Sequence, residues 1–408
     1  MKTFRLALLG SVVAGVGAMA AVDASAADVE KSVKMYGQVN RMVGIQDDGK
    51  AATVNHYDNN ISNSRVGIDA AAKSPNLTIG AKFEWSFEAG SNNDAATSQT
   101  NNTNASRGVQ DIRHSDIYFA TQYGKLSMGH GSSAAKDAAN SDLSGTTVAM
   151  SVGEPLSRGM GFSADILDAA GVSQGTVGGA ASNTSAAIQV ADVMLRADGA
   201  RRNRIRYDTP RFAGFGAAVS HGQADVSEYR LDYAGELFDT KLAAAVAAQT
   251  ASASTTQFER MYISSISAKH KSGVNLTYSY AVQNQNGSTS TGAIGVAGTG
   301  TGSNTDGRRP ATHYSKIGYS RDFFGIGDTN LAIDHQITFD GSRGGDRAVK
   351  WGGGVVQNLS AYGTELYATY ENVSYTRGST RTLATPSVTN VNGYNEINAG
   401  YFGARVKF

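Results

Sequence analysis

The sequence predicts an all-β protein in which an antiparallel sheet of about sixteen strands closes into a transmembrane barrel. Three observations lead to this fold class: an export signal at the N-terminus, segments that alternate between apolar and polar residues, and a last strand that ends on Phe408. After the signal, no apolar run approaches the ~20 residues of a membrane helix. A closed barrel is then the remaining way to span a membrane, because every backbone N–H and C=O must be paired in hydrocarbon.

Residues 1–26 carry the pattern of a cleaved export signal. Lys2 and Arg5 give a positive start, residues 6–21 are apolar, and Ala24-Ser25-Ala26 supplies a small-residue cleavage site. A membrane anchor is the alternative, but glycines interrupt this apolar stretch, which is also shorter than a membrane helix requires. We therefore expect residues 27–408 to form the mature barrel.

The composition is that of a large antiparallel β protein. Basic and acidic residues number 36 and 35 in the full chain, and removal of Lys2, Arg5 and Asp23 with the signal leaves them in balance. The net charge of the mature chain therefore gives no reason to expect nucleic acid as a partner. The chain has no cysteine, which excludes disulfides and thiol chemistry. Its 48 glycines and 18 tyrosines far outnumber its 5 prolines, which suits long paired strands.

Period-two alternation marks the strands. In Val274–Gln283 the even positions are Val, Leu, Tyr, Tyr and Val, and the odd positions are polar or small. Ile79–Glu88 and Tyr362–Tyr370 alternate in the same way, whereas Leu242–Ala248 and Phe258–His270 are poorly patterned. A β-sandwich also places charged faces toward solvent, so alternation by itself does not separate a sandwich from a barrel.

The spacing of the breaks favours the barrel. Short turns at one end and long loops at the other are typical of transmembrane barrels. The short breaks include 74–76, 209–211, 271–273 and 323–327, and the long ones include 90–107, 285–310 and 376–393. The interval of about 132–200 is rich in Ala, Gly and Ser and carries several acids. A connection of this length is either a functional third loop or a flexible surface insertion.

The last strand predicts how the barrel closes. Counting back from Phe408, every second residue is apolar or small, whereas Arg405 and Lys407 stand on the other face. A strand with two such faces meets different surroundings on its two sides. We expect its apolar face to lie toward lipid or a neighbouring subunit, its charged face toward water, and its partner to be the strand that begins at Val33.

Several segments resemble strands of the general diffusion porins of Gram-negative bacteria. The similar segments, spread over nearly the whole mature chain, are Val33–Asn40, Ser64–Ile68, Arg204–Pro210, Trp351–Gln357 and Thr364–Tyr367. The resemblance implies a sixteen-stranded barrel in the outer membrane, usually a homotrimer, whose third loop folds into the lumen as a constriction. It also implies that Phe408 is part of the signal read by the barrel assembly machinery.

Basic side chains on the inner face are the candidates for one wall of that constriction. Strand alternation places them on the lumen side. Arg202, Arg204 and Arg206 belong to one strand and lie about 6.6 Å apart along it. These candidates are Arg65, Lys82, Arg202, Arg204 and Arg206. The resemblance adds Arg113 or the neighbouring His114. The cations either create the field of the pore or pair with loop carboxylates to hold the loop, and one contact can do both.

The resemblance places the opposing acids in the third loop. The candidates there are Asp137, Asp142 and Glu154, each of which is otherwise a solvated loop acid. The loop is longer than is usual for the family, and Gly153-Glu154-Pro155-Leu156 is the closest match to the acidic turn expected in it. Opposite charges on facing walls orient dipolar solutes and exclude apolar ones, since a field between low-dielectric walls is poorly screened.

Other patterns carry less chemistry. His114-Ser115-Asp116 contains the residue types of a hydrolase triad, but neighbouring strand residues point to opposite faces and cannot converge. The acids of Gln46–Gly49 are of the kind that bind Ca²⁺ in surface loops. His335 falls on an outward apolar face, which favours a membrane-interface or subunit contact over a ligand role. We predict no metal site.

The expected function is that of a porin, which passes small hydrophilic solutes and ions across the outer membrane by passive diffusion. We expect contact with outer-membrane lipid, no cofactor and no enzymatic activity. Two alternatives stay open: a substrate-specific channel, for a sugar or an anion, and a secreted β-rich adhesin with a β-sandwich or β-helix fold. Partition without detergent identifies the adhesin, and swelling of liposomes by sugars of graded size separates the two kinds of channel.

Overall fold

A computed structural model describes residues 29–90, 109–167, 173–177, 188–251, 258–285, 309–342, 344–377 and 393–408. The expected signal peptide lies outside these residues, as do most of the long breaks at 90–107, 285–310 and 376–393. The helical elements are α2 (Val190–Val193), η2 (Asn60–Ser62), η4 (Gln223–Asp225) and η5 (Ser360–Tyr362). Within the described ranges, no helix is long and apolar enough to cross a membrane.

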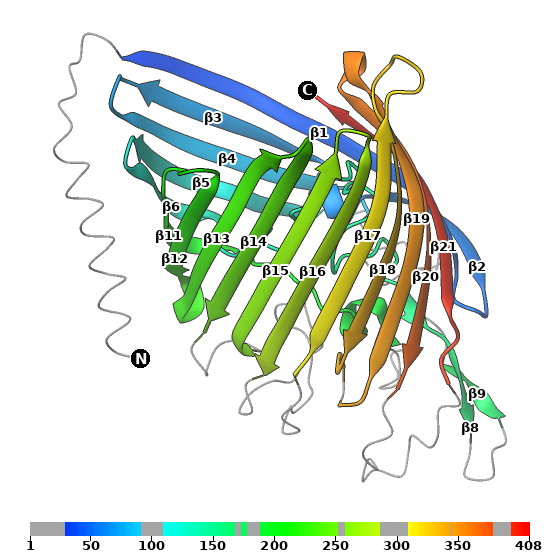
Figure 1. The fold of residues 1–408 in the computed structure, drawn as a ribbon. Helices are drawn as coiled ribbons and strands as arrows, with labels where there is room; N and C mark the ends of the chain where they lie inside the picture. Colours follow the sequence, from blue (N-terminus) through cyan, green and yellow to red (C-terminus); the bar gives the residue numbers. More distant parts are fainter. Residues whose placement is uncertain are drawn as a thin grey trace.

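One sheet of 17 strand segments forms the wall of the molecule (Figure 1). Its segments are β1 (Glu30–Asp47), β2 (Ala52–Asp58), β3 (Arg65–Lys73), β4 (Thr78–Glu88), β5 (Val109–Thr121), β6 (Gly124–Ser132), β11 (Arg201–Asp208), β12 (Phe215–Gly222), β13 (Val226–Leu237), β14 (Thr240–Thr250), β15 (Phe258–His270), β16 (Val274–Gln285), β17 (Ala311–Arg321), β18 (Thr329–Phe339), β19 (Arg347–Leu359), β20 (Thr364–Thr376) and β21 (Ile397–Lys407).

The sheet closes on itself as an antiparallel barrel of 16 strands, which confirms the predicted fold class. The first strand, β1, pairs with the last, β21, and chain neighbours pair around the rest of the ring. β2 and β3 both pair with β1 and are separated by residues 59–64, so they are two halves of one wall strand. That break, centred on η2, interrupts a strand that the sequence pattern does not show as broken.

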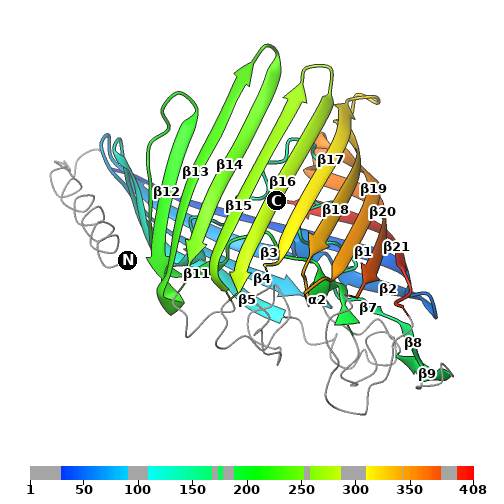
Figure 2. The ribbon, with the colours of Figure 1, turned by 60° about the horizontal axis from the view of Figure 1, so that its bottom comes forward.

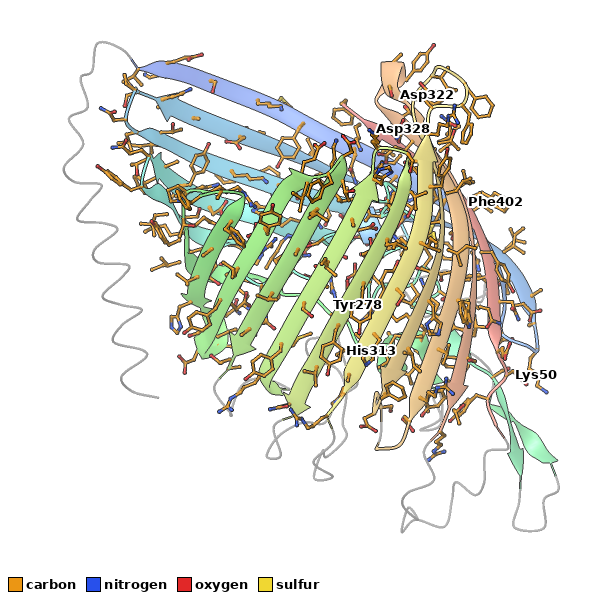
Figure 3. The ribbon with its side chains drawn as sticks, in the orientation of Figure 1. Lys50, Tyr278, His313, Asp322, Asp328 and Phe402 are labelled. Carbon is orange, nitrogen blue, oxygen red and sulfur yellow. The ribbon has the colours of Figure 1, made fainter. Side chains whose placement is uncertain are left out.

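The two ends of the barrel differ in the length of their connections (Figures 1 and 2). The β17–β18 turn with Asp322 and Asp328 lies at the end of short turns, opposite the end where Lys50 joins β1 to β2 (Figure 3). At the short-turn end, β13 and β14 are separated by two residues, 238 and 239. The long connections β4–β5, β6–β11, β16–β17 and β20–β21 all leave from the other end. This is the predicted arrangement of turns and loops.

Alternation separates an apolar outer face from a polar inner one. On β16, Leu276 and Tyr278 are exposed outward, whereas Asn275 and Thr277 point inward and are buried. On β18, His335 stands on the outer face as predicted, and its ring lies over Trp351 with centroids 4.2 Å apart. Exposed apolar side chains on the outside of a membrane barrel meet hydrocarbon rather than water.

The β6–β11 connection, residues 133–200, is here called the inner segment, and its stretches 133–162 and 188–197 pack against the inner face of the wall. It contains β7 (Gly161–Phe162), β8 (Ala164–Leu167), β9 (Ser173–Val177), β10 (Ile188–Gln189) and α2. Figure 2 shows α2 and β7 near the long-loop ends of β18–β20, where the Leu195 amide that follows α2 donates to Thr338 of β18. Apolar side chains of the segment, such as Met150, Phe162 and Met194, are buried in one cluster with Tyr367 and Tyr401 of the wall. A second cluster joins its alanines to β14–β17. Burial of apolar surface therefore holds these stretches against the inner face of the wall.

The terminal strand closes the ring at a fixed register. β21 pairs with β1 from Gln38 to Asp47, and the backbone of Phe408 exchanges hydrogen bonds with Gly37 at 2.9 and 3.1 Å. The Phe408 ring covers Gly37, where an added Cβ would lie 2.6 Å from the ring. Phe402 projects from the outer side (Figure 3), and Arg405 on the inner side pairs with Glu365. The predicted partner strand and the predicted faces are both confirmed.

Candidate functional site

The predicted basic side chains lie on the inner face of neighbouring strands. One row of paired residues crosses four of these strands, from Lys82 on β4 through Asp116 on β5 and Gly129 on β6 to Arg204 on β11. Arg65 on β3 stands opposite Ser86 of β4, on the same face. These strands therefore gather most of the candidate cations on one side of the lumen. We call this side the basic wall; it comprises Arg65, Lys82, Arg113, Arg201, Arg202, Arg204 and Arg206.

A β-bulge brings Arg113 into the basic wall. Glu84 pairs with His114, but the next residue of β4, Trp85, pairs with Ile112, which leaves Arg113 as the extra residue. An extra residue breaks the alternation of a strand and re-aims a side chain. Arg113 and His114 therefore both point inward although they are consecutive: Arg113 contacts Glu84, and His114 lies near Asp116. Alternation alone did not predict this pair.

Glu84 is shared by two arginines. Its Oε1 accepts a hydrogen bond from Arg113 Nε at 2.6 Å and lies 3.9 Å from Arg65 Nη1. Its Oε2 accepts a hydrogen bond from the hydroxyl of Tyr36 at 2.8 Å. Arg65 also donates to Ser62 Oγ at 3.1 Å, a neutral partner. One carboxylate therefore serves two guanidinium groups, and positive charge is in excess at this point of the wall.

Arg201 adds a third guanidinium to this cluster, and the sequence pattern did not find it. As the first residue of β11 it pairs only with Ser132 of β6, because pairing with β12 begins at Arg204. The charges of Arg113, Glu84 and Asp137 all act on it. Its Nε is buried and has no hydrogen-bond partner in the described part of the chain. A residue that pairs with only one neighbouring strand can depart from the alternation of side chains along its own strand. Alternation alone would have placed Arg201 on the outer face.

The other three arginines of β11 each have an acidic partner. Arg202 lies 3.6 Å from Glu228, Arg204 donates to Asp116 at 2.5 Å, and Arg206 pairs with Asp208 at 2.6 Å. Arg204 also donates to the carbonyl of Ser132 at 3.0 Å, and Arg206 to that of Ser133 at 2.8 Å. These carbonyls lie where the inner segment leaves β6. Arg204 and Arg206 therefore hold the base of the segment in addition to lining the wall.

The three acidic candidates occupy different surroundings in the inner segment. Asp137 binds Lys136 Nζ at 2.5 Å, yet 59% of its side chain is exposed. Glu154 pairs with Arg196 at 2.5 Å and is partly exposed. Asp142 is buried against Lys316 of β17, whose Nζ lies 2.6 Å away. Of the three, Asp137 presents the most accessible carboxylate.

Electrostatics in the inner segment follow from burial and these partners. Burial alone would raise the pKa of Asp142, but the Lys316 ammonium and hydrogen bonds from Ser144 outweigh it and lower that pKa. The pKa of Asp137 is also lowered, because the charges of Lys136 and Arg201 outweigh the desolvation caused by the protein around this partly exposed carboxylate. Asp198 shares Lys136 with Asp137, and burial raises its pKa. Lys136 therefore lies between the carboxylate of Asp137, whose pKa is lowered, and that of Asp198, whose pKa is raised.

Backbone groups of the inner segment are bound by wall side chains. Lys316 Nζ donates to the carbonyl of Met150 at 2.8 Å, and Glu371 of β20 accepts from the amides of Leu156 and Ser157 at 3.1 Å. Ser265 of β15 donates to the carbonyl of Ala138 at 2.6 Å. Satisfying buried backbone groups in this way fixes the path of a segment with little regular structure. These partners lie on β15–β20, away from Arg65 and Arg113.

The triad pattern does not form a catalytic site. Ser115 pairs with Phe83 on the outer face, while His114 and Asp116 point inward with Nδ1 and Oδ1 3.8 Å apart. The three side chains therefore do not converge, as strand geometry requires. Among the described residues, no group of three or more His, Asp and Glu could hold a metal ion. The acids of residues 46–49 instead accept local backbone amides: Asp47 from Gly49, and Asp48 from Lys50 and Ala51.

Comparisons with known proteins agree with this barrel. A family model described as Gram-negative porin matches residues 7–378. An anion-selective porin from Comamonas acidovorans aligns with a TM-score of 0.56 at 17% identity, covering 93% of this chain and 100% of its own. OmpT of Vibrio cholerae in its trimer form gives 0.53 at 11%, covering 93% and 99%. OmpF of Salmonella typhi with daunomycin gives 0.51 at 12%, covering 92% and 97%. A search of curated proteins gave no match.

At these identities the structural likenesses establish the fold, and the family model establishes the family. That model spans well over half of the chain, from residue 7 to residue 378. The fold it implies is the one described above: a closed antiparallel barrel with a polar inner face and an apolar outer face. The chain therefore belongs to the Gram-negative porin family and is a diffusion channel of the outer membrane.

Proposed function

We propose that small hydrophilic solutes and ions pass between the basic wall and the inner segment, and that this passage is the narrowest part of the channel. The segment is bound to Ser265 of β15 and Lys316 of β17, and these two strands lie opposite β3 and β5, which carry Arg65 and Arg113. Asp137 presents an exposed carboxylate on the segment, and the arginines face it from the wall. Opposite charges on two sides of a narrow aqueous passage create a transverse field.

We propose that the passage favours anions. The observation that carries this proposal is the excess of guanidinium over carboxylate in the basic wall, where Glu84 is the shared partner of Arg65 and Arg113 while the buried Nε of Arg201 has no hydrogen-bond partner among the described residues. Unpaired charge near a low-dielectric wall is costly, so an anion that enters relieves the repulsion among the arginines. The Comamonas porin with this fold is described as anion-selective, but the proposal rests on the residues of this chain.

The reversal potential of single channels in a salt gradient tests the preference. Two unit charges, each about 8 Å from a permeating ion in water, contribute roughly 0.5 kcal/mol apiece. Replacing Arg113 and Arg201 with Gln should therefore lower the permeability to chloride about fivefold. Lys271→Gln is the control, because that lysine is exposed in a short turn beside Asp239. An unchanged reversal potential in the double variant would show that the arginines do not face the ions.

A general channel is favoured over a sugar-specific one. A sugar channel needs aromatic rings exposed along the lumen, on which sugars slide. The inner-face tyrosines of the strands that carry the inner segment are buried instead: Tyr314, Tyr367, Tyr375 and Tyr401. We expect liposomes containing the protein to swell with sugars at rates that fall smoothly with solute size. A sharp preference for one sugar would overturn the proposal of a general diffusion channel and favour the substrate-specific channel.

We further propose that the mature chain, without residues 1–26, works as a homotrimer and has no catalytic role. The Vibrio cholerae protein with this fold is described in a trimer form. The exposed apolar outer face suits contact with outer-membrane lipid and with neighbouring subunits. Phe408, which ends the closing strand, is proposed to be read by the barrel assembly machinery. We expect the conductance to fall to zero in three equal steps. We also expect the N-terminal sequence of the purified protein to begin at residue 27.

A further inference from the structure

His114 differs from every other histidine of the chain in the face on which it stands. The chain has 7 histidines, and all of them lie in the described ranges. Strand register places His114 opposite Glu84 on the inner face. The others alternate onto the outer face: His56, His130, His221, His270, His313 and His335. Since the chain has no cysteine, His114 is the inner-wall side chain whose ordinary pKa lies between about 5 and 8.

The surroundings of His114 are charged, but its Nδ1 stands too far from Asp116 for a normal hydrogen bond. Its Nδ1 is buried, has no partner among the described residues, and lies 3.8 Å from Asp116 Oδ1. The other oxygen of Asp116 accepts from Arg204. These three side chains meet above Gly131 of β6, where an added Cβ would lie 2.7 Å from Arg204, 2.8 Å from Asp116 and 3.0 Å from His114.

The groups that act on His114 come from each neighbouring strand. The charged side chains facing it are Lys82 and Glu84 on β4, Asp116 and the adjacent Arg113 on β5, and Arg204 on β11. β6 contributes Gly131 and no charge. Glu84 already pairs with Arg113, and Asp116 already pairs with Arg204. A neutral His114 ring therefore leaves the net charge of this wall unchanged. A protonated ring adds one positive charge and needs about 1 Å of movement to donate to Asp116.

We infer that His114 is a specificity-determining residue whose protonation increases the preference of the channel for anions as the pH falls. The inference rests on the proposed passage along the basic wall and adds its regulation. A single unit charge at about 8 Å from the ion in water changes chloride permeability about twofold. The effect is therefore a graded change in selectivity, and the channel stays open at both pH 8.0 and pH 5.5.

Reversal potentials at pH 8.0 and pH 5.5, measured on the intact mature protein in planar bilayers, test the inference. For the natural protein we expect the chloride to potassium permeability ratio to rise about twofold or more on acidification. His114→Gln should keep its pH 8.0 value at both pH values. His114→Lys, charged throughout, should show the acid value at both. His335→Gln, on the outer face, is the matched control and should respond like the natural protein.

Two results would overturn the inference. One is a natural protein whose permeability ratio does not change between the two pH values. The other is a His114→Gln channel that still responds, in which case Asp198→Asn identifies the titrating group, because burial raises the pKa of Asp198 in the inner segment. Heat-dependent gel mobility shows that each variant has formed its barrel. The Arg113 and Arg201 variants, read at one pH, test the passage itself, so failure of one proposal is distinguishable from failure of the other.

Discussion

Breaking the ion pair between Asp142 and Lys316 should release the inner segment from the wall. Lys316 Nζ is fully buried on β17 and donates to Asp142 Oδ2 at 2.6 Å, to the Met150 carbonyl at 2.8 Å and to Thr146 Oγ1 at 3.1 Å. Removing one partner of a buried pair costs about 3–5 kcal/mol, because the other charge stays behind. In Asp142→Asn the remaining acceptors, which belong to Met150, Thr146 and Ser144, still solvate the ammonium, so we expect about 3 kcal/mol.

That loss appears in the docking equilibrium of the segment, since the pair joins the segment to the wall rather than one wall strand to another. At about 1.4 kcal/mol for each factor of ten, the undocked fraction rises roughly a hundredfold. Hydrogen exchange of the peptide covering residues 141–157, followed by mass spectrometry, measures it directly. The amides of Leu156 and Ser157, which are bound by Glu371, should exchange about a hundred times faster in the variant.

Two further variants distinguish the effect of the Asp142–Lys316 ion pair from the effects of neighbouring contacts. Asp142→Asn combined with Lys316→Met removes both charges and should recover most of the lost protection, which is the signature of a true pairwise term. Lys271→Gln breaks an exposed pair with Asp239 and should change nothing in this peptide, since exposed pairs contribute about 0–1 kcal/mol. Unchanged exchange in Asp142→Asn would refute the reasoning, because the segment would then be held by its apolar contacts alone.

Three other predictions follow from single contacts. The lowered pKa of Asp142 means that its contribution to docking is complete above the ordinary carboxyl pKa of about 3.9 and is lost as the pH falls through the lowered value. The inner segment should therefore stay docked from pH 8 to pH 5, and the single-channel current should become unstable only well below pH 4, a step that Asp142→Asn should lack. Gly131→Val places side-chain atoms where Arg204 and Asp116 meet, so the channel should fold, as gel mobility checks, but carry less current. Gly37→Val collides with the Phe408 ring, so it should lower the yield of heat-modifiable barrel, whereas Gly400→Ala, with nothing within 4 Å, is the matched control.

The wall was predictable from the sequence because alternation reports which side of a strand meets water. The strand at Val274–Gln283, the faces of Ile79–Glu88 and the pairing of the last strand with the one containing Val33 all follow from a period of two. The poorly patterned strands β14 and β15 pair in full register nonetheless. Their inner faces carry apolar residues against the inner segment, namely Ala245, Ala247, Met261 and Ile263, so the contrast between an apolar and a polar face that marks other strands is missing there.

The site was less predictable because its key features break that period. The bulge at Arg113 and the one-sided pairing of Arg201 both depend on neighbouring strands, which local sequence does not report. The partners of the acidic candidates come from elsewhere in the fold. Asp142 meets Lys316, which lies 174 residues away in the chain, and no spacing rule connects them. Local patterns give the face of a side chain, whereas the ion pairs require the closed barrel.

The seam between β1 and β21 also dictates an order of events in time. Its hydrogen bonds join β1, the first wall strand along the chain, to β21, the last one. Until β21 has been synthesised and has crossed the inner membrane, the sheet has two open edges, each a row of unpaired backbone groups. Hydrocarbon does not tolerate such edges, and contacts so distant along the chain form slowly. Insertion into the membrane therefore waits for β21, and the chain must be kept from aggregating until β1 and β21 meet.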